Sequence, residues 1–174
     1  MVIGKNFIWL HMGKTGGNST KLMFEGLDGI LYTDSIHDPK KHSNLTRTDI
    51  DATLLQDKKI ICNIRKLPAW IKSYRQQRIV VHNKVLTLEE LCMSAEGHIK
   101  TYSNSVDYWI RTEQLADDFI KIISNFIDIS PEQEKNIRRI HINKRTYSHD
   151  LTQEDIDYLY DSCPTWKKYE EMVY

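Results

Sequence analysis

The chain has 174 residues, of which 40% are hydrophobic and 28% charged, a composition typical of one globular domain. Lys plus Arg and Asp plus Glu both number 24, so the formal net charge is zero. A general nucleic-acid or membrane-surface binder carries a basic excess, so this balance argues against both classes, and any anion site must be local.

The first part of the chain alternates between expected strands and helices. Phe7–Leu10 is a short apolar run that leads towards a glycine cluster, as expected of a buried strand. Asn18 or Ser19 can cap a helix that runs to Gly26, where glycine supplies the stop. The next expected elements are a strand at 29–33, a polar loop at 34–45, a short helix at 48–55 and a strand at 59–64.

The second part is mostly helical. Pro68, well placed in a first turn, begins a long helix that reaches about Val81. The remaining expected elements are a helix after the capping box Thr87–Glu90, a strand at 106–110, a helix at 112–127, and helices that begin at Ser130–Gln133 and Thr152–Asp155. This order predicts a single α/β domain over 1–174, with a short, mostly parallel sheet and helices on both faces in three layers.

Three separated cysteines indicate neither a disulfide framework nor a zinc site. Cys62, Cys92 and Cys163 form no CxxC pair, and Cys62 lies in an apolar run that favours the core. The apolar run at 7–10 is too short for a signal sequence or a membrane span. These features predict a cytoplasmic protein without a membrane partner.

The segment that joins the first strand to the first helix, His11–Thr20, has the composition of an anion cradle. Three glycines allow the backbone to turn tightly and bring N–H groups close to an anion, and the following helix N-terminus adds its own. Lys14 adds a positive charge. The candidate ligand-binding residues are Gly13, Lys14, Thr15, Gly16, Gly17, Asn18, Ser19 and Thr20.

This loop does not match the Walker A pattern. That pattern places its lysine after the last glycine, whereas Lys14 precedes Gly16 and Gly17. The strand at 59–64 is also followed by Arg65 and not by the aspartate that a P-loop kinase needs. An ordinary glycine-rich turn with a solvated lysine remains the structural alternative.

The run Phe7–Ser19 resembles the donor loop of the sulfotransferase family, an apolar strand followed by Lys-Thr-Gly-Gly-Thr-Ser. Gly13 stands where that family usually has proline, and Asn18 where it often has threonine. The resemblance implies a P-loop-like sulfotransferase fold. It also implies binding of the 5′-phosphosulfate of 3′-phosphoadenosine 5′-phosphosulfate (PAPS), with Lys14 beside the bridging oxygen and no metal ion required.

A second resemblance concerns the family's Arg and Ser that bind the 3′-phosphate of the donor. Arg65 follows the third expected strand, and Ser73 comes eight residues later, about two helical turns into the next helix. The sequence departs from the family at Lys66-Leu67-Pro68 and at Trp70, which aligns with an arginine. A simple surface pair of Arg65 and Ser73 is the alternative.

Weaker resemblances continue to the end of the sequence. Tyr108–Leu115 is similar to a late strand followed by Glu-x-Leu, and 169–174 is similar to the common family ending. The segment 141–145 is similar to one that returns to the donor, which implies a further phosphate contact from Lys144 or Arg145. A solvated basic stretch is the alternative.

Together these patterns predict transfer of a sulfuryl group from PAPS to a hydroxyl acceptor, such as a carbohydrate, with PAP as product. Lys14 would stabilise the leaving phosphate, and His42 is favoured as the general base over His37 and Asp38 because an imidazole titrates near neutrality. The alternatives are a non-catalytic nucleotide-binding domain of the same fold and a P-loop nucleotide kinase.

Overall fold

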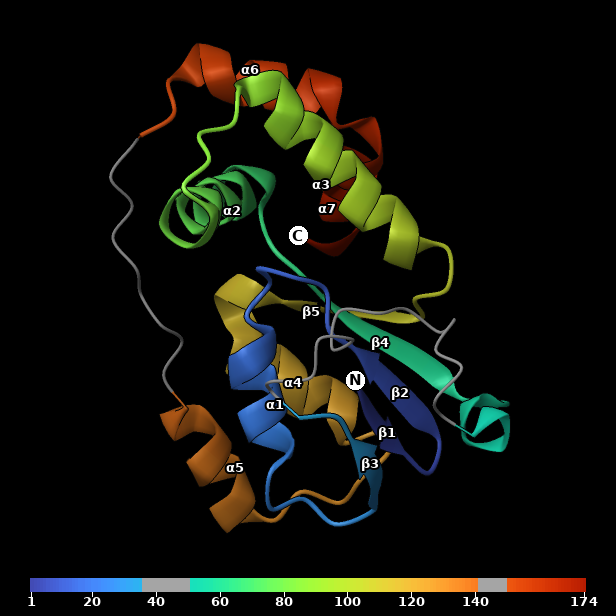
Figure 1. Cartoon of the computed structure of the whole chain (residues 1–174). Coiled ribbons are helices and arrows are strands. Elements are labelled where there is room, and N and C mark those ends of the chain that lie inside the picture. Colours follow the sequence, from blue (N-terminus) through green and yellow to red (C-terminus); the bar gives the residue numbers. More distant parts are fainter. Residues whose placement is uncertain (36–50, 141–149) are drawn as a thin grey trace. The chain divides into compact units, whose positions relative to one another are not determined.

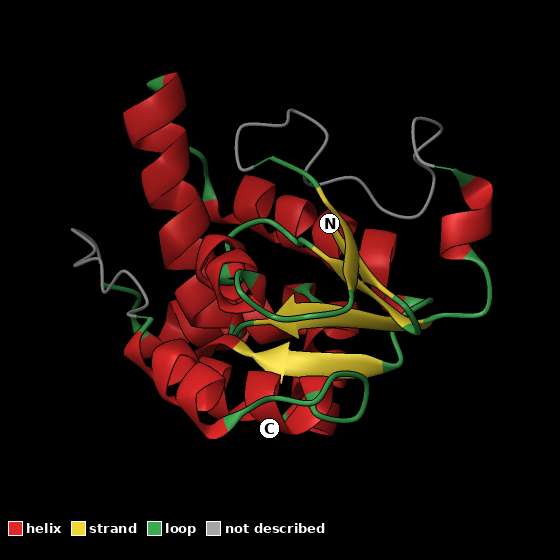
Figure 2. Cartoon of the chain, turned by 90° about the horizontal axis from the view of Figure 1, so that it is seen from below, coloured by secondary structure: helices red, strands yellow, loops and turns green. Residues whose placement is uncertain are grey.

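The computed structural model describes residues 1–35, 51–140 and 150–174 (Figure 1). Their contacts divide the chain into two compact units, Met1–Ile64 with Ser105–Ile142 and Arg65–Asn104 with Asn143–Tyr174. The described residues contain five strands and seven α-helices, which confirms the α/β class (Figure 2). That residues 1–174 form a single domain stays a prediction.

The first unit contains a five-stranded sheet of order β3-β1-β2-β4-β5. The strands are β1 (Val2–Gly4), β2 (Phe7–Leu10), β3 (Ile30–Thr33), β4 (Lys59–Ile64) and β5 (Tyr108–Arg111). The β2–β4 and β4–β5 pairings are parallel, while β1 is antiparallel to both of its neighbours. The sheet is therefore mixed and not mostly parallel in its pairings, although the four predicted strands all point the same way.

The sequence analysis missed β1, which forms a tight hairpin with β2. Val2 lies opposite Trp9 and Ile3 opposite Ile8, so only two residues make the turn. Gly4 precedes this turn, and a Cβ atom there would lie 2.1 Å from the Phe7 ring. With three residues the strand is too short to show a periodic pattern, but its apolar side chains are fully buried.

Three helices of the first unit pack on one face of the sheet: α1 (Gly17–Phe24), α4 (Leu115–Ile123) and α5 (Pro131–Arg139). The core on this face joins Trp9 and Ile61 of the strands to Phe24 of α1, Phe119 of α4 and Ile137 of α5. The rings of Phe24 and Phe119 meet edge to face, with centroids 4.7 Å apart. A second helical layer on the sheet remains a prediction.

Two predicted helices differ in their bounds from the structure. The segment 112–127 divides into a short 3₁₀ turn at Thr112–Gln114 and α4, and the expected short helix is a 3₁₀ turn at Ala52–Leu55 within the described residues.

The prediction that Asn18 or Ser19 caps the first helix is wrong. Gly16, with φ of 79°, is the N-cap of α1, because glycine adopts the left-handed conformation without a steric penalty.

A buried ion cluster ties the hairpin to α1 and to the residue after β3. The carboxylate of Asp34 accepts hydrogen bonds from the side chain of Lys21 and from the amino group of Met1. The side chains of Lys21 and Asp34 are at most 5% exposed. Each charge therefore depends on its partners, because solvent does not reach them.

The second unit consists of α2 (Leu67–His82), α3 (Leu88–Ser103), α6 (Gln153–Ser162) and α7 (Pro164–Val173). The predicted capping box begins α3 at Thr87. The predicted helix starts at Thr152 of α6 and, in the first unit, at Ser130 of α5 are capping boxes as well. Trp70 and Trp166 pack in the core of the second unit, with ring centroids 5.0 Å apart. Trp70 is thus a core residue.

The cysteines are free and buried, as expected for Cys62 on β4. Burial raises the pKa of the Cys62 thiol to about 12, which keeps it protonated and unreactive at neutral pH. Among the residues described here, no helix is both long enough and apolar enough to cross a bilayer.

Candidate functional site

The glycine-rich loop follows β2 at the point where the strand order of the sheet reverses. From β2 the chain continues through the loop and α1 to β3, on one side of β2, and later forms β4 on the other side. In open α/β sheets, ligands bind at such a switch point, beyond the carboxyl ends of the strands. The topology of the first unit therefore marks this loop as its candidate binding site.

The backbone of the loop turns through two residues with positive φ. Lys14 has φ of 68° and Gly16 has φ of 79°. A lysine in the left-handed region is strained by about 1–2 kcal/mol, and such strain concentrates at functional sites. A glycine at position 14 would avoid this strain, so the loop retains a charged residue there despite its cost.

Position 17 requires a glycine because the His11 side chain lies against it. A Cβ atom at position 17 would lie 2.0 Å from the His11 imidazole, which is buried and also contacts the Trp9 ring. His11 is therefore a packed residue at the end of β2. The glycine pair is thus explained by local geometry.

The threonine hydroxyls of the loop donate within the loop itself. Thr15 Oγ1 donates to Met12 O at 2.7 Å, and Thr20 Oγ1 lies 3.3 Å from Gly16 O. Both threonines are fully buried, whereas Ser19 is half-buried. Among the candidate binding residues Thr15, Ser19 and Thr20, Ser19 is the one whose hydroxyl does not donate to these loop carbonyls.

Two residues that were not predicted as site residues hold the loop: Asn63 on β4 and Thr112 in the turn that follows β5. Asn63 Nδ2 donates to Thr15 O at 2.9 Å and to Thr20 Oγ1 at 2.7 Å, while Asn63 Oδ1 accepts from Trp9 Nε1 at 2.8 Å. Thr112 Oγ1 also contacts Thr15 O, at 2.9 Å. A fully buried asparagine in an otherwise apolar strand was the available signal.

Asn63→Asp is expected to destabilise the protein by about 3 kcal/mol or more, because it buries a carboxylate beside the Thr15 carbonyl and removes the amide donor. Urea unfolding measures the loss. Asn6→Asp in the exposed hairpin turn is the matched control and should change little. Equal stability of the two variants would show that the amide of Asn63 does not hold the loop.

The start of α1 has no side-chain cap. The first helical bond is Thr20 N to Gly16 O at 3.1 Å, so the amides of Gly17, Asn18 and Ser19 have no acceptor within the helix. The first turn of α1 contains no acidic residue. This end of the helix, beside Lys14, is therefore suited to a negatively charged group.

Arg65 and Ser73 belong to the second unit. Arg65 is half-buried and its carbonyl accepts from Trp166 Nε1 at 3.0 Å, while Ser73 is buried within α2. That Arg65 and Ser73 share a site with the loop of the first unit stays a prediction.

Five further predicted residues lie outside the described residues. They are the three base candidates and the two basic residues near the end of the chain: His37, Asp38, His42, Lys144 and Arg145. Their predicted roles stay predictions.

No family model, no curated protein and no solved structure matches the chain. The features of the chain that bear on function are therefore the loop, its place in the sheet and the resemblance of its residues to the sulfotransferase donor loop.

Proposed function

We propose that the chain binds PAPS on the loop His11–Thr20 and transfers its sulfuryl group to a hydroxyl acceptor. The observation that carries the proposal is a strained lysine, Lys14, beside the N-terminus of α1, which has no side-chain cap and lies at the switch point of the sheet. The order Lys-Thr-Gly-Gly in this loop supports a phosphosulfate donor over other anions.

The residues of the loop fit such a donor. The amides of Gly17, Asn18 and Ser19 and the hydroxyl of Ser19 can donate to phosphosulfate oxygens, and Lys14 supplies a full positive charge. When bound, PAPS supplies the activated sulfuryl group and PAP is its leaving group. Lys14 stabilises the negative charge that grows on the phosphate oxygen as its bond to sulfur breaks.

The acceptor proton requires a base, for which we propose His42. As the acceptor oxygen bonds to sulfur, its proton passes to the imidazole, whose ordinary pKa lies near neutrality. The resemblance further assigns Arg65 and Ser73, and Lys144 or Arg145, to the phosphates of the donor. These assignments belong to the same proposal.

Asn63 favours this function over a P-loop kinase. In P-loop NTPases, the loop Ser or Thr and a strand-end aspartate hold Mg²⁺. Here the Thr20 hydroxyl receives a hydrogen bond from the neutral amide of Asn63, which supplies no negative charge for a cation. A donor bound without magnesium agrees better with this arrangement.

Calorimetry with PAP and with ATP–Mg²⁺ tests the proposal. We expect saturable binding of PAP and no response to ATP–Mg²⁺, because the loop offers an anion cradle without a carboxylate for magnesium. Binding of ATP–Mg²⁺ alone would remove the proposal. Transfer of labelled sulfate from PAPS to a panel of glycans, phenols and alcohols then separates an enzyme from a non-catalytic nucleotide-binding domain.

A further inference from the structure

Two of the three cysteines meet in the core of the second unit. Cys92 lies in α3, and Cys163 lies at the corner where α6 ends and α7 begins. The thiol of Cys163 donates to the carbonyl oxygen of Cys92, with 3.7 Å between Sγ and O, and the two thiols also share a hydrogen bond. The contact joins residues 71 positions apart, so the spacing of the cysteines along the sequence does not show it.

Hydrogen bonds between α3 and α7 hold Cys163 over Cys92. Glu96 lies one helical turn after Cys92, on the same face of α3. Its carboxylate accepts from Thr165 N at 3.2 Å and from Trp166 N at 3.1 Å, in the first turn of α7. The start of α7, which follows Cys163 directly, is therefore fixed to the face of α3 that carries Cys92.

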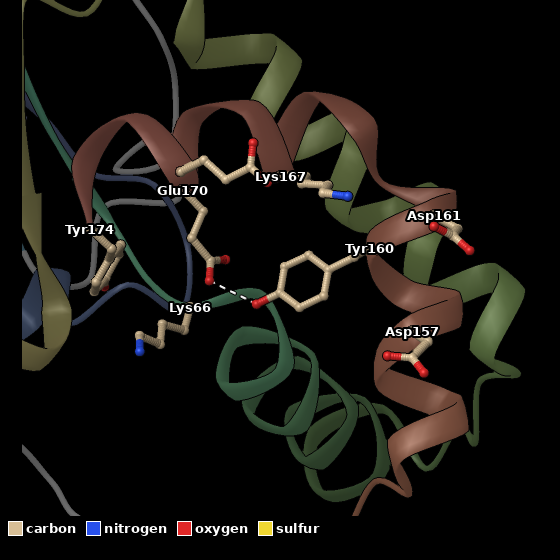
Figure 3. A pocket seen from close by; sticks show the side chains of 8 residues that line it. Lys66, Asp157, Tyr160, Asp161, Lys167, Glu170 and Tyr174 are labelled. Carbon is tan, nitrogen blue, oxygen red and sulfur yellow. Dashed lines mark hydrogen bonds between the residues drawn. The ribbon is translucent and has the colours of Figure 1, made fainter.

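A second hydrogen bond fixes the corner between α6 and α7. The Tyr160 hydroxyl of α6 donates to the buried carboxylate of Glu170 of α7 at 2.7 Å, the bond drawn in Figure 3. The two helices are thus joined both at Cys163 and at this bond. The packing of three helices therefore keeps the two thiols in contact, which gives each a high effective concentration beside the other.

The two thiols differ in their exposure and in their pKa values. Cys92 is 4% exposed, whereas Cys163 is fully buried. Burial raises the pKa of Cys92, which hydrogen bonds with Cys163 and Ser162 then lower in part. Burial also raises the pKa of Cys163, and the neighbouring Cys92 raises it further. Cys92 is therefore the thiol that a small oxidant reaches first, and the reaction is slow at neutral pH because the thiolate is the reactive form.

We propose that Cys92 and Cys163 form a reversible disulfide pair that responds to hydrogen peroxide. The Cys92 sulfur bonds to one peroxide oxygen, the O–O bond breaks, and the second oxygen leaves as water with the thiol proton, which produces a sulfenic acid. The Cys163 sulfur then bonds to the Cys92 sulfur, and the hydroxyl group leaves as water with the Cys163 proton. The two sulfurs together lose two electrons, which reduce one peroxide molecule to two water molecules.

The disulfide ties α3 to the corner between α6 and α7. A cross-link between residues 71 positions apart restricts the unfolded chain, so the oxidised protein should be more stable than the reduced one. Cys62, on β4 of the first unit, provides an internal reference, because its oxidation state should not change in the same reaction.

Peroxide treatment of the reduced full chain under native conditions tests the proposal. After alkylation in urea, mass spectrometry should count one free thiol in place of three, and peptide mapping should show Cys92 linked to Cys163. Dithiothreitol should restore all three thiols. The oxidised chain should unfold at a temperature about 5 °C or more above that of the reduced chain.

Cys62→Ala is the matched control and should lose both of its remaining thiols to the same disulfide. Cys163→Ser should form no disulfide within the chain and gain no thermal stability from peroxide, and circular dichroism checks that each variant folds. Retention of three thiols in the unaltered chain, a disulfide that includes Cys62, or a disulfide that forms only in urea would overturn the proposal. None of these measurements involves PAPS, so the result is independent of the sulfuryl-transfer function.

Discussion

Lys14→Ala is expected to lower sulfuryl transfer from PAPS by at least about 10²–10³-fold, the effect of removing one group that stabilises transition-state charge. The substitution removes the positive charge of the loop but retains a Cβ atom in the left-handed conformation, so the backbone strain stays the same. Transfer of labelled sulfate measures the activity, and calorimetry measures the affinity for PAP. Lys14→Arg retains a positive charge, so it should keep part of the activity and part of the affinity.

Lys14→Gly separates the charge from the strain. It removes the same charge but relieves the positive φ, so the free energy of unfolding should rise by up to about 1 kcal/mol while transfer is lost. Lys5→Ala in the exposed hairpin turn is the control and should leave transfer unchanged. Full activity of Lys14→Ala would disprove the role of the loop.

His42→Ala should lower the rate of sulfuryl transfer and have little effect on the affinity for PAP, because the proposed base acts on the acceptor and not on the donor.

Asp34→Asn is expected to lower the free energy of unfolding by about 3–5 kcal/mol, because it removes the buried negative charge that the Lys21 ammonium and the Met1 amino group share. Lys21→Met should cost less, since Asp34 then keeps its bond to Met1. Urea unfolding at neutral pH measures both values.

Asp28→Asn is the control for this pair, because Asp28 is exposed in the same segment of the chain. Its stability should stay within about 0.5 kcal/mol of the unaltered chain. A similarly small effect of Asp34→Asn would mean that water reaches the ion cluster, contrary to the burial of its side chains.

Local signals predicted most of the elements. The strand at 59–64 has the predicted bounds, and the capping boxes at Thr87, Ser130 and Thr152 begin helices where the sequence placed them. These signals act over four residues, so a single sequence displays them. The strand β1 has no such signal, because three apolar residues fit a loop as well as a strand.

The candidate site was predictable only in its continuous part. The loop His11–Thr20 is one segment with a recognisable composition, and its place at the end of a buried strand follows from the pattern. Asn63 and Thr112 contact Thr15 from 48 and 97 residues away. Contacts of that separation depend on strand order, which the sequence pattern does not specify.

The helix starts of the second unit have a consequence for how this unit folds. Glu96 of α3 accepts from the first amides of α7, Thr165 N and Trp166 N, and Glu170 of α7 in turn accepts from Leu67 N at the start of α2. The last of these bonds joins residues 103 positions apart. Closing so large a loop is slow, and α2 gains its terminal acceptor only once α7 is in place. During synthesis, α2 and α3 therefore leave the ribosome before their partner exists, and we expect the second unit to form cooperatively only after α7 has emerged.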